Sequence, residues 1–272
     1  MIVVTGATGN VGRPLVEALA AAGEKVVAVS RGEAEFPAGV VHRKADLAAP
    51  ETLKSAFEGG ERLFLLTRDQ DLDIVPVLDA ARAAGIGRVV LLSSERVATR
   101  PEEPELRVFE DAVKASGLEW TMLRPGGFSS NALLWAEPVS KERKVLAPFG
   151  DVGLPLVDPL DIAEVAAATL TEDGHAGKAY SLTGPALMTP RGQSTAIAAA
   201  IGEPVAFVEQ TRAEAFEQLL EFWPAEVVEG SLDVMGNPNA AEQRISEDVE
   251  RVLGRPPIPF ADWAKRNAAA FR

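Results

Sequence analysis

The stretch of sequence that decides the fold is VVTGATGNVGRPL, residues 3–15. The residues before Gly6 form an apolar, β-branched run typical of a buried strand, and those after Gly12 have helical spacing. Between strand and helix, one glycine makes a tight bend, one lets backbone N–H groups approach a pyrophosphate, and one lets the two elements pack closely. Gly6, Gly9 and Gly12 match these positions. The stretch therefore predicts a dinucleotide-binding turn, with the positive end of the helix facing the phosphates.

The alternation of strand and helix continues to about residue 125. Short apolar runs typical of buried parallel strands alternate with segments of helical spacing. We expect strands over 2–5, 25–30, 40–43, 62–67, 88–93 and 119–124. We expect helices over 12–22, 50–58, 72–84 and 105–116. This rhythm predicts an α/β protein of the Rossmann type, with a doubly wound parallel sheet.

The sequence changes character after Arg124, where Pro-Gly-Gly is followed by a short aromatic helix expected over 130–136. Further along, Asp161 is expected to cap a helix over 162–170, and residues 178–183 have the composition of a strand. We therefore assign 1–125 and about 156–184 to a dinucleotide-binding domain. We assign about 126–155 and 185–272 to a smaller C-terminal substrate lobe.

Composition excludes several classes of function. The chain has no cysteine, which rules out disulfides, thiolate nucleophiles and cysteine-ligated metals. Its net charge of −13 disfavours binding to nucleic acid or to anionic membranes. The two histidines are isolated from each other and from carboxylate clusters, so no metal site is expected. The sequence has no long apolar run and no signal segment before the first strand, so we expect a cytoplasmic protein. We expect it to be a monomer or a homodimer and to act on a small molecule.

The end of the second strand indicates which dinucleotide is bound. Proteins that select NAD usually have an acidic residue there, which binds the ribose 2′-hydroxyl. This chain has Ser30 and Arg31, and a guanidinium suits a 2′-phosphate, so NADPH is favoured over NADH. Two alternatives stay open, that Glu33 or Glu35 folds back onto the ribose, or that Arg31 is only solvated.

Several motifs together resemble a known family. They are TGATGxxG at 5–12, ADL around Asp46, LLSS at 91–94, SGLEWTMLRPGGF at 116–128 and DIAEVAA at 161–167. In these segments the chain is similar to the NmrA-like proteins, atypical members of the short-chain dehydrogenase/reductase superfamily. The resemblance extends from Ile2 to about Thr183. It implies a two-lobed protein in which the nicotinamide lies between the ends of the strands and the small C-terminal lobe.

The resemblance also implies which residues contact the cofactor. The residues expected along the pyrophosphate are Gly6, Thr8, Asn10 and Val11. Arg31 is expected to reach the adenosine 2′-phosphate, and Asp46 and Leu47 to lie near the adenine. The nicotinamide is expected near Thr67, Ser93 and Pro125. Some relatives reduce quinones or enones, and others bind the cofactor without turnover and act as redox-sensing partners of regulators.

The usual catalytic pair of short-chain reductases is absent from the sequence. These enzymes use a tyrosine as general acid, with a lysine four residues later. The only tyrosine is Tyr180, which is followed four residues later by Gly184 and lies in a strand-like run, so we expect a packing role. On the helix that should carry the pair, Glu110 and Lys114 are spaced as an ordinary surface ion pair. His42 and His175 are also expected to have structural or surface roles.

The residues that remain favour an apolar substrate pocket with few acids, formed by Phe128, Asn131, Trp135 and Phe149. Such a pocket suits a flat, conjugated acceptor whose own resonance takes up negative charge. The hydroxyls of Ser94 and Thr67, at strand ends, are hypothetical proton donors. The function expected is an NADPH-dependent reductase of a conjugated carbonyl or quinone. The alternative is a non-catalytic redox sensor that docks on a regulator.

Overall fold

The computed structural model describes residues 1–67 and 72–272, which form two compact units. Unit 1 comprises Met1–Pro125, Pro159–Leu182 and Asp248–Arg255. Unit 2 comprises Gly126–Asp158, Thr183–Glu247 and Pro256–Arg272.

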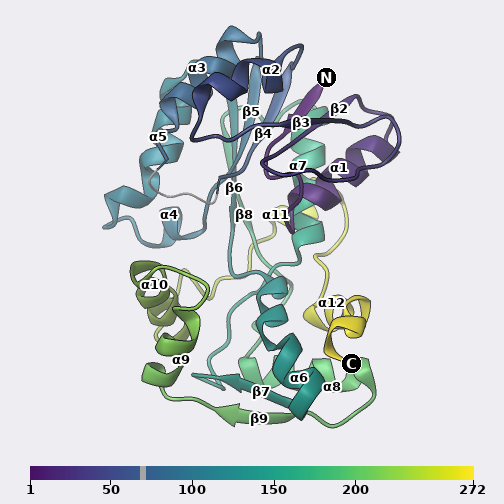
Figure 1. Cartoon of the computed structure of the whole chain (residues 1–272). Helices are drawn as coiled ribbons and strands as arrows, with labels where there is room; N and C mark the ends of the chain where they lie inside the picture. Colours follow the sequence, from purple (N-terminus) through teal and green to yellow (C-terminus); the bar gives the residue numbers. More distant parts are fainter. Residues whose placement is uncertain (68–71) are drawn as a thin grey trace. The chain divides into compact units, whose positions relative to one another are not determined.

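Unit 1 is built on a seven-stranded sheet in which all neighbouring strands run parallel (Figure 1). Its strands are β1 (Ile2–Val4), β2 (Val26–Ser30), β3 (Val41–Lys44), β4 (Arg62–Leu65), β5 (Arg88–Leu92), β6 (Glu119–Pro125) and β8 (Lys178–Leu182). Their order across the sheet is β3-β2-β1-β4-β5-β6-β8. The order reverses between β1 and β4, and ligands of such sheets bind at the carboxyl ends of the strands at this switch point. The predicted doubly wound α/β fold is confirmed.

Helices cover both faces of this sheet. Those of unit 1 are α1 (Gly12–Ala21), α2 (Leu53–Phe57), α3 (Val75–Ala83), α4 (Arg96–Thr99), α5 (Val108–Ala115), α7 (Pro159–Thr171), α11 (Asp248–Leu253) and the 3₁₀ helices η1 (Pro50–Thr52) and η2 (Pro104–Arg107). In Figure 1, α1 and α7 lie on one side of the sheet, and α2, α3 and α5 on the other. Helix α7 packs on β4, β5 and β6 as well as on α1.

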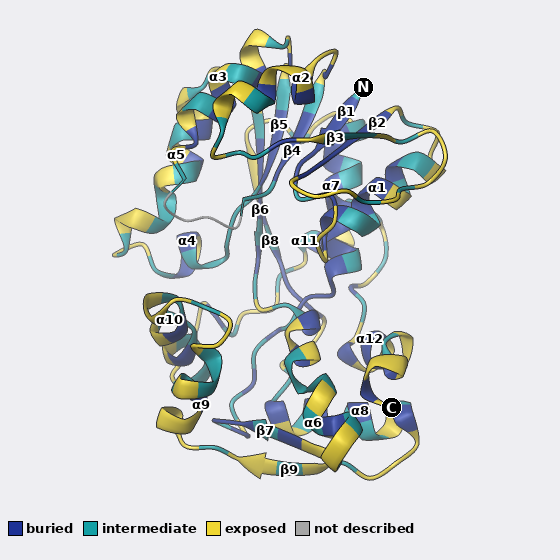
Figure 2. Ribbon diagram, viewed as in Figure 1, coloured by how far each residue is buried: buried dark blue, intermediate teal, exposed yellow. Residues whose placement is uncertain are grey.

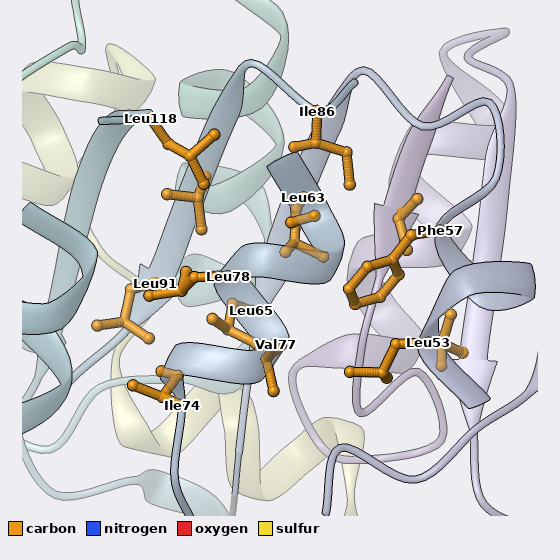
Figure 3. Close-up of a cluster of buried hydrophobic side chains, with 14 of the residues drawn as sticks. Leu53, Phe57, Leu63, Leu65, Ile74, Val77, Leu78, Ile86, Leu91 and Leu118 are labelled. Carbon is orange, nitrogen blue, oxygen red and sulfur yellow. The ribbon is translucent and has the colours of Figure 1, made fainter. Parts of the chain in front are cut away.

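The core between the sheet and α2 and α3 consists of aliphatic side chains and one large aromatic ring. Figure 3 shows Leu53 and Phe57 on α2 facing Leu63 and Leu65 on β4. All four are fully buried. Each such side chain contributes about 1.5–3 kcal/mol of transfer free energy. Because the central strands are covered on both faces, they are drawn as buried in Figure 2.

Several expected helices differ from the observed ones at their ends. The segment expected over 72–84 becomes helical at Val75, where the side chain of Asp73 accepts a hydrogen bond from Val75 N at 3.1 Å. The prediction that Asp161 caps a helix is wrong, because α7 begins at Pro159. Asp161 instead lies buried in the first turn, and its carboxylate pairs with Arg255 Nη1 at 2.8 Å.

Unit 2 combines a two-stranded parallel sheet with short helices. Its elements are η3 (Ser129–Trp135), α6 (Ala136–Glu142), β7 (Lys144–Ala147), α8 (Pro190–Ile201), β9 (Ala206–Glu209), α9 (Arg212–Leu219), α10 (Ala225–Gly236), α12 (Phe260–Arg266) and η4 (Ala268–Phe271). Its core contains Val139, Val145, Ile197, Phe260 and Trp263. Strand β9 is largely exposed, as Figure 2 shows. The short helix expected over 130–136 is the 3₁₀ helix η3, with α6 directly after it.

Helix α11 differs from the sequence-based division, which assigned all of 185–272 to the smaller lobe. It packs on α7 and β8 within unit 1. The carboxylate of Asp248 accepts a hydrogen bond from Ser181 N at 2.9 Å, which fixes the helix to the edge strand. The labels dinucleotide-binding domain and substrate lobe stay predictions.

Across residues 1–67 and 72–272, no helix combines the length and the apolar content that crossing a bilayer requires.

Candidate functional site

The glycine-rich turn lies at the carboxyl end of β1 and leads into α1. Gly6 has a φ of 61°, in the left-handed region that glycine adopts without steric cost. Gly9 N donates a hydrogen bond to Gly6 O at 2.9 Å and closes the turn. A Cβ on Gly12 would lie 2.2 Å from Gly6 O. The helix can therefore follow the turn this closely only if residue 12 has no side chain.

Thr5 fixes this turn to β4. Its Oγ1 accepts a hydrogen bond from Leu66 N at 2.8 Å and lies within donating distance of Leu66 O (3.1 Å) and Phe64 O (3.2 Å). The side chain thus holds together the ends of β1 and β4, the two strands at the switch point of the sheet.

A cleft of about 600 Å³ opens at these strand ends, within the range of small-molecule and cofactor sites. The predicted cofactor residues on its wall are Gly6, Thr8, Gly9, Arg31, Asp46, Leu47 and Thr67. The other three predicted cofactor residues of the turn lie off the wall, with Asn10 exposed and Val11 and Gly12 buried. Ser93 follows β5 and Pro125 ends β6, and neither is part of the wall.

Arg31 differs in its surroundings from the other cations near the cleft. The Lys44 ammonium pairs with the Glu33 carboxylate at 3.1 Å, and Arg13 stacks on the ring of Phe36 and donates to Glu35 O at 3.2 Å. Arg31 is exposed on the cleft wall, and among the described residues no carboxylate pairs with it. Glu33 is held by Lys44, and neither Glu33 nor Glu35 lines the cleft. The guanidinium of Arg31 is thus available to an anionic group.

The loop after β3 is held in place by its own hydrogen bonds. Asp46 N donates to Thr52 Oγ1 at 3.2 Å, and this hydroxyl is 3.1 Å from Asp46 O. The Asp46 carboxylate accepts from Ala48 N at 3.1 Å. Asp46 and Leu47 are therefore fixed on the cleft wall.

These features fit a dinucleotide. The close approach of Gly12 to Gly6 leaves bare backbone at the N-terminus of α1, where a pyrophosphate is favoured by the helix dipole. Arg31 offers a planar fork of donors to a further phosphate.

A buried carboxylate lies beside the end of β5. Glu110 is fully buried, and its carboxylate accepts hydrogen bonds from Arg124 Nε (2.8 Å), Arg124 Nη2 (2.7 Å) and Ser93 Oγ (2.8 Å). Burial raises the pKa of Glu110, but the bonds from Arg124 and Ser93 outweigh it and hold the pKa below its ordinary value. Glu110 therefore stays ionised and orients the Ser93 hydroxyl.

The interpretation of Glu110 and Lys114 as an ordinary surface pair is wrong. Lys114 Nζ does lie 3.2 Å from the Glu110 carboxylate, but the bidentate partner is Arg124. The helical spacing of the sequence indicated only Lys114, four residues after Glu110, as a partner. The contact with Arg124 joins residues fourteen positions apart, and no local pattern predicts it.

The two proposed proton donors occupy different environments. Thr67 lies on the cleft wall just after β4. Ser94 follows β5 and is half-buried, and its Oγ accepts from Arg96 N at 3.3 Å, which leaves the hydroxyl proton available.

Tyr180 lies within β8, paired in register with Leu123 of β6. Its hydroxyl is 2.8 Å from His175 Nδ1, so this histidine has a buried partner rather than a surface role. Burial raises the pKa of Tyr180 and lowers the pKa of His175, which keeps both groups neutral. His42 contacts Ser30, with its Nε2 2.8 Å from the hydroxyl.

Unit 2 contains a separate cavity of about 170 Å³. Three of the four predicted pocket residues, Phe128, Asn131 and Trp135, line it. Phe149 does not, because its ring packs against Gly236 of α10, where a Cβ would lie 2.6 Å from it. The wall also includes Gln193, Gln210 and Gln218, which sequence reasoning missed. These glutamines come from three different segments, and nothing in their spacing marks them.

Among the described residues, no three histidine, aspartate or glutamate side chains are grouped as metal ligands would be.

The parallel sheet, the glycine turn and the cleft at the switch point define a Rossmann-type protein that binds a dinucleotide. A family model described as NAD(P)H-binding matches residues 6–173. The chain belongs to this family, the NmrA-like branch of the atypical short-chain dehydrogenases/reductases, and it is an NAD(P)H-dependent oxidoreductase.

Three similar proteins support this assignment. The (4-alkanoyl-5-oxo-2,5-dihydrofuran-3-yl)methyl phosphate reductase of Streptomyces griseus subsp. griseus is 37% identical, over 100% of this chain and 99% of its own. The NAD(P)H azoreductase of Xenophilus azovorans is 31% identical, over 100% and 99%. The structure of an NADPH-dependent quinone oxidoreductase from Escherichia coli superposes with a TM-score of 0.78 at 26% identity, covering 98% of this chain and 99% of that one.

Proposed function

We propose that this protein is an NADPH-dependent reductase that delivers a hydride to a conjugated small molecule, a quinone, an enone or an unsaturated lactone. The observation that carries the proposal is the environment of Tyr180. Its hydroxyl contacts His175 from within β8, and the residue four positions later is Gly184, which supports hydride transfer without a tyrosine–lysine pair. An acceptor that disperses negative charge over its own conjugated system needs no such acid.

The names of the similar proteins support this substrate class. The Streptomyces compound is a dihydrofuranone whose ring double bond is conjugated to two carbonyls. A quinone and an azo compound can also accept a hydride at one end of a conjugated system, and the displaced π electron pair then moves to the other end, where it takes up a proton. The shared chemistry is reduction of an acceptor that stabilises its own anion.

We assign the following roles to the residues at the cleft. Bound NADPH supplies the hydride. Arg31 would bind the 2′-phosphate, and the turn from Gly6 to Gly12 would hold the pyrophosphate against the N-terminus of α1. Ser94 or Thr67, or water, would give a proton to the oxygen that gains the electron pair. Preference for NADPH over NADH follows from Arg31, because Glu33 is occupied by Lys44.

The test is NADPH oxidation with matched acceptors, cyclohex-2-enone and 1,4-naphthoquinone against cyclohexanone. We expect the conjugated acceptors to be reduced at least 100-fold faster than the saturated ketone. Equal rates, or a preference for cyclohexanone, would contradict the proposal. If none of the three acceptors is turned over, the proposed substrate class is wrong.

A further inference from the structure

The cavity of unit 2 has a wall without charge. Among the described residues that line it, none has an ionisable side chain, although charged residues make up 25% of the chain. Aromatic and aliphatic side chains form most of the wall, and its polar side-chain groups are amides, the indole N–H groups of Trp135 and Trp223, and the hydroxyl of Ser231. A phosphate or carboxylate moved from water into such a cavity loses its hydration and gains no counter-ion. The wall therefore selects for an uncharged group.

Gln193 is the polar group best placed to bind a ligand. It lies in the first turn of α8, where Thr189 caps the helix by accepting from Gly192 N at 3.0 Å. Gln193 N donates to Thr189 O at 2.9 Å, so the backbone that carries the side chain is fixed. The residue is only 7% exposed and lines the cavity, and within the described part of the chain its amide has no hydrogen-bond partner. The amide atoms of Gln193 are not among the fully buried atoms that lack a partner, so they keep access to the cavity. A ligand that displaces water from them must replace its hydrogen bonds.

The neighbouring polar groups are already occupied. Gln210 Nε2 donates to Gln218 Oε1 at 2.8 Å, so these two amides use part of their capacity on each other. Arg191, two residues before Gln193, does not line the cavity and pairs with Asp151 (3.0 Å) and Glu209 (3.1 Å). The nearest cation along α8 is thus neutralised. Among the amide side chains of the wall, Asn131 is exposed and Gln210 and Gln218 are half-buried, so Gln193 is the buried one.

We propose that this cavity binds the uncharged, carbonyl-bearing ring of the substrate, with Gln193 Nε2 donating a hydrogen bond to the carbonyl oxygen. The proposal rests on the reductase function proposed above and narrows its substrate class to neutral conjugated carbonyl compounds. A cavity of about 170 Å³ suits this role, since an apolar cavity of about 150 Å³ holds one benzene ring. Gln193 acts here as a specificity residue, because its hydrogen bond fixes the orientation of the ring.

The first test compares a phosphate with its parent alcohol on the wild-type enzyme. The two substrates are the dihydrofuranone methyl phosphate named for the Streptomyces relative and the corresponding free alcohol. We expect kcat/KM to be at least tenfold higher for the alcohol. An equal value for the two, or a higher one for the phosphate, would overturn the charge selection.

The second test isolates Gln193 by binding alone. Coumarin, a neutral conjugated lactone, is titrated by calorimetry into wild type and Gln193→Leu, with 2H-chromene, which lacks the carbonyl, as the matched ligand. We expect Gln193→Leu to weaken coumarin binding about tenfold and to leave chromene binding unchanged, as loss of one hydrogen bond predicts. Gln243→Leu is the control, because Gln243 donates to Gly153 O at 3.0 Å, lies off the cavity wall and should affect neither ligand.

The two tests fail in different ways. If no substrate is reduced but coumarin binding depends on Gln193, the reductase proposal fails and the binding site stands. If conjugated substrates are reduced but wild type does not bind coumarin, or Gln193→Leu weakens both ligands equally, the site assigned to Gln193 is wrong and the reductase proposal stands. Should Gln193→Leu not fold, the comparison of alcohol and phosphate on wild type still decides the charge selection.

Discussion

Arg124 binds Glu110 through two parallel hydrogen bonds, Nε to one carboxylate oxygen at 2.8 Å and Nη2 to the other at 2.7 Å. The pair joins β6 to α5, and Ser93 at the end of β5 donates to the same carboxylate. A bidentate arginine–carboxylate pair is strong and fixes both side chains in one geometry. The pair and the Ser93 hydrogen bond therefore connect the end of β5, where the nicotinamide is expected, to helix α5.

Replacing Glu110 by glutamine should destabilise the protein by about 3 kcal/mol, as removal of one partner of a buried ion pair does. The amide keeps the shape of the side chain but leaves the Arg124 guanidinium without its counter-ion. The free energy of unfolding, measured by urea denaturation at pH 7, checks this. Glu137→Gln is the matched control, because Glu137 pairs with Lys141 in solvent and its loss should not be measurable. Equal effects of the two variants would show that the buried pair contributes no more than a surface one.

The same pair predicts a pH dependence. The folded pKa of Glu110 lies below its ordinary value of 4.5, so its ionisation stabilises the fold above the unfolded pKa. The stability difference between wild type and Glu110→Gln should be constant above about pH 5.5 and should shrink as the pH falls through 4.5 toward the folded pKa. Urea denaturation of both proteins from pH 7 to pH 3 measures it. A difference that grows on acidification would mean that the folded pKa is raised.

The fold was largely predictable because the apolar runs and glycines are local signals. Every strand expected in the first 125 residues is present. The inner strands such as β1 and β2 are buried on both faces, which requires continuous apolar runs, whereas β3 lies at the edge of the sheet and is largely accessible. Helix ends were less predictable. Aspartate is a common N-cap residue, but Asp161 lies within the first turn of α7, where it pairs with Arg255, almost a hundred residues away in the sequence.

The residues of the site could be predicted only where they belong to a local sequence motif. The glycine-rich turn is one local motif and Arg31 follows the second predicted strand, and Gly6, Thr8, Gly9 and Arg31 all line the cleft. Glu110 and Gln193 were missed because their roles depend on partners or cavities formed by distant segments. Phe149 was placed in the pocket by its aromatic character, whereas Gly236 provides the space that its ring fills.

Arg31→Asp should abolish a preference for NADPH over NADH that we expect to be at least tenfold in wild type. The guanidinium lies on the cleft wall without a carboxylate partner among the described residues, and a 2′-phosphate would supply one. Titration calorimetry with both cofactors measures the ratio of the two dissociation constants. Arg82→Ala is the control, because Arg82 lies on α3 off the cleft wall, pairs with Asp79 at 3.7 Å and should leave the ratio unchanged. If wild type binds both cofactors equally, or if Arg31→Asp keeps the preference, Arg31 does not select the cofactor.

Gly12→Ala should weaken NADPH binding at least tenfold and lower the melting temperature. The added Cβ would lie 2.2 Å from Gly6 O, and because both atoms belong to backbone or are fixed to it, helix and turn must separate. Thermal unfolding with and without NADPH separates the loss of stability from the loss of binding. Gly87→Ala is the control, since no atom lies within 4 Å of the Cβ that it would add and its φ is not positive. An alanine at 12 that binds NADPH like wild type would show that the turn tolerates the separation.

Tyr180→Phe should keep nearly all of kcat, whereas Ser94→Ala or Thr67→Val should lower it if a side chain supplies the proton. A true general acid contributes about 10²- to 10⁴-fold, so its loss is obvious in a steady-state assay. Tyr180 lies within β8 and its hydroxyl contacts His175, while burial raises its pKa, so it is a poor donor at neutral pH. The measurement is kcat of the three variants on one conjugated substrate, with NADPH affinity determined for each. Small effects in all three would make water the donor. A thousandfold loss confined to Tyr180→Phe, with cofactor affinity intact, would place the acid at Tyr180 and contradict the proposed site.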